Sequence, residues 1–143
     1  MNYFDTSALV KRFVDEPGSP AVDALIAEGP TATATVAFAE VYAGLARKRR
    51  ARELTEAAYK SACRQFEAEW PAYVRVALRD EVLLLARDLI RRHPLRGFDA
   101  IHLASALTLK VALAEDMTFV ASDERPLTAA KAERLKGTNP EEA

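Results

Sequence analysis

Four acidic residues occupy positions from which a folded chain could use them for chemistry: Asp5, Glu40, Asp99 and Asp123. Asp5 and Asp123 each follow a short apolar stretch that predicts a β-strand, and Asp99 lies in or just before the first turn of a mostly apolar helix. Glu40 lies on the apolar stripe of another predicted helix. Because parallel strands end at one edge of a sheet, we expect these carboxylates to converge there.

Each of these residues also has an ordinary explanation. Asp5 and Asp99 could cap the helices that follow them, and Glu40 could extend from the edge of its stripe into solvent. If the carboxylates do converge, their mutual repulsion raises some of their pKa values unless a cation neutralises it. Oxygen ligands without thiolates or clustered imidazoles favour Mg²⁺ or Mn²⁺ over Zn²⁺. Such an ion keeps positions for water and substrate oxygens, which suits hydrolysis of a phosphodiester.

Two other reactive side chains receive simpler interpretations. His102 lies one turn beyond Asp99 and could bind a metal ion, but no other histidine is close in sequence, so we expect a packed or hydrogen-bonding side chain. The single Cys63 cannot form an intramolecular disulfide and is expected to be structural in a reducing compartment. The scattered glycines form no phosphate-binding loop, which excludes P-loop and dinucleotide-binding enzymes.

The elements that must position these residues alternate between strand and helix, which predicts an α/β fold with a parallel sheet. The predicted strands are the stretch before Asp5 and residues 31–33, 73–76, 118–121 and 136–140. The first predicted helix begins near Ala8, and others cover about residues 20–28, 35–49, 53–69, 80–92 and 127–135; residues 98–107 start a further, mostly apolar helix. Residues 141–143 are expected to form a frayed tail.

Composition predicts one domain over residues 1–143, since the chain has 143 residues of which 50% are hydrophobic. We find no charged leader and no apolar run of roughly 18 residues, so we expect no membrane span and a cytoplasmic location. Basic and acidic side chains number two and six in residues 1–45, thirteen and seven in residues 46–96, and five and eight in residues 97–143. The basic middle, notably Arg47, Lys48, Arg49, Arg50, Arg52, Arg91, Arg92 and Arg96, could contact phosphates or complement a helix C-terminus.

Four blocks of the sequence together resemble the PIN domain family, specifically the VapC-type toxin ribonucleases. They are FDTSALVKRFVDEPGS, AFAEVYAGLARK, RGFDAIHLASAL and TFVASDERPLTAAKAE, and they follow the family's order along nearly the whole chain. The resemblance implies a three-layer α/β/α sandwich with a mostly parallel central sheet. It also implies an acidic pocket formed by Asp5, Glu40, Asp99 and Asp123, of which Asp123 lies at the position where the family varies.

The resemblance further implies a metal-dependent endoribonuclease in which one or two Mg²⁺ or Mn²⁺ ions, held by the four carboxylates, activate a water that attacks RNA. Ser7 or Thr6 matches a small hydroxyl that orients the first Asp or a metal-bound water. Family members usually form homodimers and are inhibited by a cognate antitoxin whose C-terminal segment crosses the groove. Residues that could contact RNA or the antitoxin are Arg47, Lys48, Arg49, Arg50 and Arg96.

Two other functions fit parts of the sequence. A phosphoaspartyl hydrolase or receiver-like domain would use Asp5 as nucleophile or phosphoacceptor, although haloacid-dehalogenase-type enzymes carry a second Asp where this chain has Ser7. A catalytically silent PIN-like domain could act as a binding module or scaffold, but all four acidic positions are filled here.

Overall fold

The computed structural model describes residues 1–142, and its centre is a five-stranded parallel sheet with the order β3-β2-β1-β4-β5. The strands are β1 (Asn2–Phe4), β2 (Thr31–Ala34), β3 (Val74–Val76), β4 (Thr118–Val120) and β5 (Lys136–Thr138). In the central strand, Tyr3 pairs with Ala32 of β2 on one side and Phe119 of β4 on the other. The predicted α/β fold and its parallel sheet are therefore confirmed, and β5 lies at the edge as expected.

Helices follow the strands in the predicted alternation. They are α1 (Thr6–Leu9), α2 (Ser19–Ala27), α3 (Ala37–Arg50), α4 (Glu56–Glu69), α5 (Asp80–Arg92), α6 (Gly97–Leu113) and α7 (Glu124–Ala132). Short 3₁₀ turns cover Val10–Arg12, Trp70–Ala72 and Pro140–Glu142. No helix in residues 1–142 has both the length and the apolar character needed to cross a bilayer.

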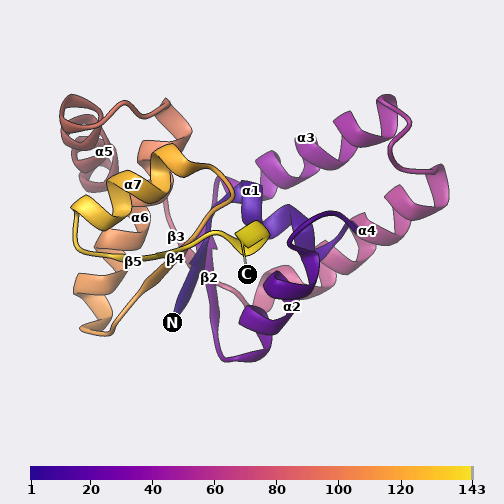
Figure 1. Ribbon diagram of the computed structural model, residues 1–143, viewed down its shortest axis with the longest axis horizontal. Coiled ribbons are helices and arrows are strands. Elements are labelled where there is room, and N and C mark those ends of the chain that lie inside the picture. Colours follow the sequence, from indigo (N-terminus) through magenta and orange to yellow (C-terminus); the bar gives the residue numbers. More distant parts are fainter. Residues whose placement is uncertain (143) are drawn as a thin grey trace.

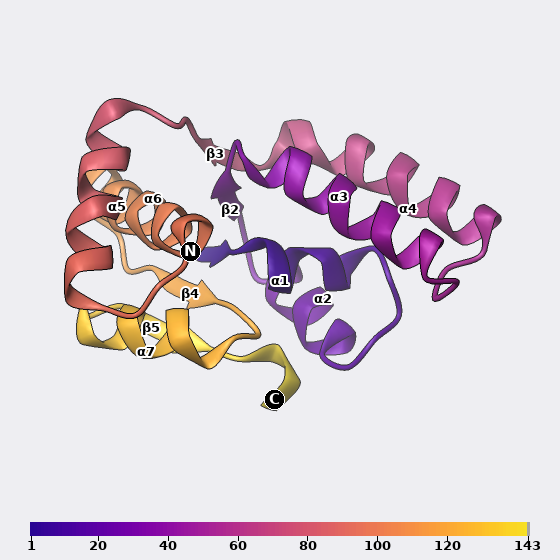
Figure 2. The same ribbon diagram turned by 90° about the horizontal axis from the view of Figure 1, so that it is seen from above.

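The sheet separates two layers of helices, because successive side chains of a strand point to opposite faces. Tyr3 packs in a core with apolar residues of α5, α6 and α7, whereas its neighbour Phe4 packs in a second core with residues of α1 to α4. The two helical layers lie on opposite sides of the strands in Figure 1. In Figure 2, α3 and α4 run side by side and extend away from the sheet. This is the predicted three-layer sandwich.

Several predicted boundaries differ from the structure, and specific contacts account for three of these differences. Helix α4 begins at Glu56 because the Thr55 side chain caps it by accepting a hydrogen bond from the Ala58 N–H. Helix α7 begins at Glu124, directly after Asp123, because Asp123 accepts a hydrogen bond from the Arg125 N–H. The segment from residue 141 to 142 is part of a 3₁₀ turn, and Glu141 Oε2 lies 3.6 Å from Lys11 Nζ. The frayed tail predicted there is wrong for these two residues, and Ala143 lies outside the described residues.

The topology brings distant parts of the chain to one edge of the sheet. The Asp5 N–H donates to the Val120 carbonyl across a 3.1 Å hydrogen bond, so β1 and β4 end side by side. Asp5 and Asp123 follow these two ends, while α3 follows β2 and α6 packs against the same strand. The edge is therefore flanked by the two helices that carry Glu40 and Asp99.

Candidate active site

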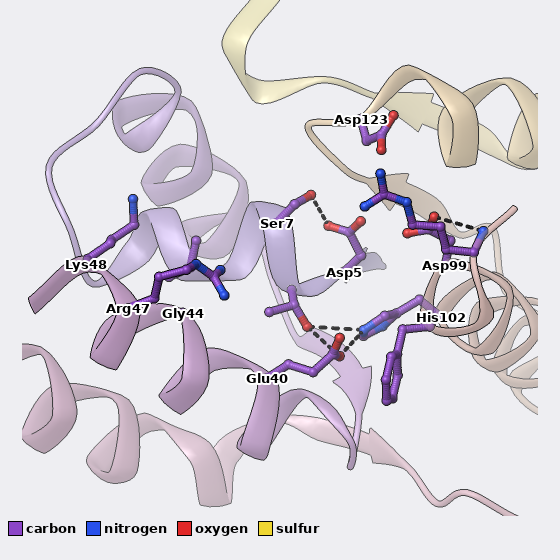
Figure 3. A pocket seen from close by; sticks show the side chains of 13 residues that line it. Asp5, Ser7, Glu40, Gly44, Arg47, Lys48, Asp99, His102 and Asp123 are labelled. Carbon is purple, nitrogen blue, oxygen red and sulfur yellow. Dashed lines mark hydrogen bonds and ion pairs between the residues drawn. The ribbon is translucent and has the colours of Figure 1, made fainter. Parts of the chain in front are cut away.

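A pocket of about 350 Å³ opens at this edge of the sheet. All four predicted acidic residues line it, together with both predicted hydroxyl residues and three of the predicted basic residues. Its complete lining is Asp5, Thr6, Ser7, Val10, Glu40, Gly44, Arg47, Lys48, Arg96, Phe98, Asp99, His102 and Asp123. Figure 3 shows the carboxylates arriving from separate elements, with Asp5 between Glu40 and Asp123.

Asp5 is the most enclosed of the acidic groups, with 4% of its surface exposed. Its Oδ1 accepts hydrogen bonds from the Ser7 hydroxyl at 2.6 Å and from the Ala8 N–H at 3.0 Å. Burial raises the pKa of Asp5 and the Asp99 charge adds to the rise, although the charge of His102 and these two donors oppose it. Asp5 thus caps α1 through one oxygen while its carboxylate faces the pocket.

The Ser7 hydroxyl connects the ends of two strands. It donates to Asp5 and accepts a 3.1 Å hydrogen bond from the Ser122 N–H, which lies just beyond β4. Because a hydroxyl has one proton, the N–H of Ser122 leaves that proton available for the carboxylate. Ser7 therefore fixes the orientation of Asp5 relative to the segment that carries Asp123.

Glu40 reaches the pocket from α3 and is held by two side chains. Its Oε1 accepts from the Thr6 hydroxyl at 2.7 Å and lies 2.8 Å from His102 Nε2. Burial alone raises the pKa of Glu40, but the hydrogen bond and charge of His102, with the Thr6 hydroxyl, lower it below its ordinary value. A glutamate on an apolar helical stripe is therefore ionised here and directed toward the site, as Figure 3 shows.

His102 is a hydrogen-bonding side chain, as predicted. It is 3% exposed, and its Nδ1 lies 2.8 Å from the Tyr3 hydroxyl while its Nε2 contacts Glu40. Both ring nitrogens are occupied by protein groups, so His102 cannot ligate a metal ion without giving up one of these bonds.

Asp99 and Asp123 complete the set from the opposite side of the pocket. Asp99 lies in the first turn of α6, where its Oδ2 accepts from the Arg96 N–H at 3.3 Å. Asp123 caps α7 through Oδ1, which accepts from the Arg125 N–H at 3.0 Å. The capping role that the sequence suggested for Asp99 is real, and Asp123 caps a helix as well; capping occupies only one oxygen of each carboxylate.

The same division holds for all four acidic residues. Within residues 1–142, one oxygen of each carboxylate accepts protein hydrogen bonds and the other accepts none. No group of three or more His, Cys, Asp or Glu side chains among these residues is arranged so that it could hold a metal ion. The convergence is thus that of a shared pocket rather than of a tight cluster. The chemistry of these donors nonetheless suits Mg²⁺ or Mn²⁺, because Mg²⁺ is commonly held through one or two carboxylates and keeps several waters.

The predicted basic residues divide into two groups. Arg47, Lys48 and Arg96 line the pocket, and Lys48 Nζ is paired with Glu16 Oε2 at 2.8 Å. Arg49 and Arg50 do not line it, and the Arg49 guanidinium lies over the Tyr59 ring with 4.2 Å to its centroid. Arg47 and Arg96 form no salt bridge within residues 1–142, although they share the pocket with the four carboxylates.

Sequence reasoning did not assign a site role to Phe98, Val10 and Gly44, which also line the pocket. Phe98 is 54% exposed, which is unusual for an aromatic side chain and places its ring at the entrance. The only signal in the sequence is its position between Arg96 and Asp99 in the first turn of α6. Val10 and Gly44 belong to apolar patterns that predict core packing, and nothing in those patterns distinguishes pocket lining from core.

Comparison with known proteins places this arrangement in a family. The family model of the PIN domain matches residues 3–132. Ribonuclease VapC45 of Mycobacterium tuberculosis (strain CDC 1551 / Oshkosh) is 43% identical over 108 residues, covering 75% of this chain and 75% of that protein. Ribonuclease VapC49 of Mycobacterium tuberculosis (strain ATCC 25618 / H37Rv) gives the same values.

Solved structures share the fold over almost the whole chain. A toxin-antitoxin complex from Klebsiella pneumoniae matches with a TM-score of 0.69 and 16% identity, covering 98% of both chains. FitAcB from Neisseria gonorrhoeae matches with a TM-score of 0.68 and 14% identity, again covering 98% of both chains. At these identities the likeness is one of fold.

Proposed function

The chain belongs to the PIN domain family, with VapC ribonucleases among its relatives, and we propose that it is a metal-dependent endoribonuclease acting as the toxin of a toxin-antitoxin pair. One observation carries the catalytic part of this proposal. Asp5, Glu40, Asp99 and Asp123 line a single pocket, and each has one carboxylate oxygen that accepts no hydrogen bond from residues 1–142.

These four residues are the proposed holders of Mg²⁺ or Mn²⁺. A bound divalent cation lowers the pKa of water and offsets the negative charge that develops on the phosphate. Asp5 and Asp99 provide the free oxygens at the centre, and Glu40 and Asp123 bind directly or through water. Ser7 and Thr6 are supporting residues, because each donates a hydrogen bond that fixes the rotamer of a carboxylate.

The RNA backbone is expected to approach from the basic side of the pocket. Arg47 and Arg96 line the pocket and form no salt bridge within residues 1–142, so they can bind phosphates beside the scissile bond. Lys48 is already paired with Glu16 and contributes less. Arg49 and Arg50 lie outside the pocket and are better placed for more distant phosphates or for a partner chain.

The test is cleavage of a structured RNA pool by antitoxin-free protein, in Mg²⁺ or Mn²⁺ and in EDTA. We expect cleavage that needs the metal ion and that is lost in Asp5→Asn and Asp99→Asn, since both variants keep similar shapes and remove a charge. Arg134→Gln serves as a control for a change of charge outside the pocket. Cleavage at the wild-type rate by folded Asp5→Asn protein, or undiminished cleavage in EDTA, would contradict the assignment.

Two partners belong to the proposal. A cognate antitoxin should bind the groove and stop cleavage when added in equimolar amount, in keeping with the toxin-antitoxin complexes among the structural neighbours.

We also propose a homodimer and a cytoplasmic location, where RNA is present and the free Cys63 stays reduced. Helix α5 exposes Leu83, Leu84 and Ile90, which supply an apolar surface for a second copy. Light scattering that gave only the 15.7 kDa monomer at working concentration would contradict the dimer.

A further inference from the structure

A chain of hydrogen bonds extends from the centre of the sheet to Glu40. The Tyr3 hydroxyl lies 2.8 Å from His102 Nδ1, and His102 Nε2 lies 2.8 Å from Glu40 Oε1. Tyr3 is fully buried and stacks on Phe119 with 5.7 Å between ring centroids. The Tyr3 hydroxyl, the first group in this series of hydrogen bonds, is therefore fixed relative to the sheet. These contacts join residues that lie 99 and 62 positions apart in sequence.

The direction of the hydrogen bonds follows from the groups involved. A carboxylate only accepts, so His102 Nε2 must carry a proton and donate it to Glu40. When the ring carries one proton, Nδ1 accepts from the Tyr3 hydroxyl, and when it carries two, Nδ1 donates to the Tyr3 oxygen; in both forms Nε2 donates to Glu40. The Thr6 hydroxyl donates to the same Glu40 oxygen at 2.7 Å. The N–H of His102 and the hydroxyl of Thr6 therefore both point to Oε1 of Glu40.

The consequence is a single orientation for a long side chain. A glutamate has several rotatable bonds, and one at the edge of an apolar stripe would otherwise extend into solvent. Both donors bind Oε1 of Glu40. The other oxygen, Oε2, receives no hydrogen bond from residues 1–142 and is free to bind a ligand. Figure 3 shows Glu40 next to His102, joined to it by a dashed line, with Asp5 nearby.

We infer that Tyr3 and His102 are positioning residues that hold Glu40 ready to bind a divalent cation or its water, acting through Glu40 without touching the substrate. This inference rests on the proposed function, since it assigns the network to the same metal site. Hydrogen-bonding partners behind metal ligands typically affect metal affinity or activity by about 10- to 100-fold. The effect should therefore appear in Mn²⁺ binding as well as in cleavage.

The first experiment compares two buried tyrosine hydroxyls. Tyr3→Phe removes the hydroxyl that contacts His102 and keeps the ring that stacks on Phe119. Tyr73→Phe removes the hydroxyl of another buried tyrosine, which lies 3.2 Å from Glu69 and lines no part of this pocket. Mn²⁺ affinity, measured by calorimetry, should fall about 10-fold in Tyr3→Phe and stay unchanged in Tyr73→Phe. The kcat for RNA should fall with it, while KM stays the same because the phosphate contacts remain.

The second experiment uses rescue at His102. His102→Gln retains an amide N–H that can donate to Glu40, whereas His102→Leu has similar size and no donor. Both variants lose the imidazole and its packing, so thermal unfolding without metal should change by comparable amounts. If the role is positioning, Gln should retain most of the Mn²⁺ affinity and Leu should lose at least about 10-fold.

Failure of the positioning role and failure of the metal site give different results. Wild-type Mn²⁺ affinity in both Tyr3→Phe and His102→Leu would overturn the positioning role and leave the nuclease proposal standing. The positioning role would also be overturned if His102→Gln and His102→Leu lost Mn²⁺ affinity equally and in proportion to their loss of thermal stability. That result would indicate that His102 only packs. Absence of Mn²⁺ binding by the folded wild-type protein would overturn the proposed metal site and this inference together.

Discussion

Ser7 Oγ lies 2.6 Å from Asp5 Oδ1 and donates the shortest hydrogen bond that this carboxylate receives. The bond joins the first residue after β1 to a hydroxyl that also binds the Ser122 N–H beyond β4. A side chain two positions from Asp5 thus couples the carboxylate to both central strands. Contacts of this kind control which charges the pocket carries at a given pH.

Ser7→Ala should move the pH dependence of cleavage upward. The Ser7 hydrogen bond lowers the pKa of Asp5 against the rise that burial causes, so its removal raises that pKa further. Asp5 must be ionised to act as a ligand in the proposed metal site, and the acidic limb of the pH–rate profile is therefore expected to shift to higher pH. Ser7→Thr keeps the hydroxyl and is the control, expected to retain the wild-type profile. An unshifted acidic limb in Ser7→Ala would contradict the role of this bond.

Asp5→Asn should stabilise the metal-free protein at pH 7 by about 1 kcal/mol, because it removes a buried charge and keeps an oxygen that can accept the same two hydrogen bonds. Burial raises the folded-state pKa of Asp5 above its unfolded value. The folded state then holds a proton that the unfolded state has released, and stability falls as pH rises through the folded-state pKa. Urea unfolding at pH 4 and pH 7 should show a larger gain for the variant at pH 7.

Glu40→Gln is expected to behave in the opposite way. Burial works against ionisation of Glu40, yet the bonds from His102 and Thr6 lower its folded-state pKa below the unfolded value. The ionised form therefore contributes stability above the unfolded pKa, and this contribution is lost as pH falls through the folded pKa. The variant should be less stable than wild type by about 1 kcal/mol at pH 7, with a smaller difference at pH 4. A gain in stability at pH 7 would contradict the geometry described for this residue.

Arg47→Ala should weaken RNA binding more than Arg50→Ala, although both residues lie on the exposed surface of α3. Arg47 lines the pocket and Arg50 does not. Loss of one phosphate contact should reduce the slope of log affinity against log salt by about 0.7 for single-stranded RNA. Fluorescence anisotropy with a labelled RNA, on the cleavage-silent Asp5→Asn background, gives the measurement. Equal salt slopes for the two variants would place the phosphate contacts elsewhere.

The sequence predicts the fold well where local signals and tertiary packing agree. Helix α5 spans Asp80–Arg92 as predicted, because its apolar period and its charged ends all indicate the same boundaries. Strands β1 and β4 are parallel neighbours, so their C-terminal ends lie at the same edge of the sheet. Asp5 and Asp123, which follow these ends, therefore lie at that edge. Acidic residues that follow such strand ends can therefore be assigned to a common pocket from the sequence alone.

Other features depend on contacts between residues far apart in sequence, which local patterns do not encode. The turn at Pro140–Glu142 is held by the pair of Glu141 with Lys11, so a polar end segment that looks frayed is ordered. The partners of His102 come from β1 and α3, and its sequence neighbours give no indication of either. The exposed Phe98 ring was likewise not predicted, because helix periodicity does not say which first-turn residue faces a pocket.

The most direct test of the metal site is an anomalous difference map from crystals of the protein soaked in Mn²⁺. We predict a peak inside the pocket, coordinated by the carboxylates of Asp5 and Asp99 and with Glu40 and Asp123 as direct or water-mediated ligands. The peak should be absent from crystals of Asp5→Asn treated in the same way. A Mn²⁺ peak outside this pocket, or one that persists in the pocket of Asp5→Asn at full strength, would contradict the proposed metal site.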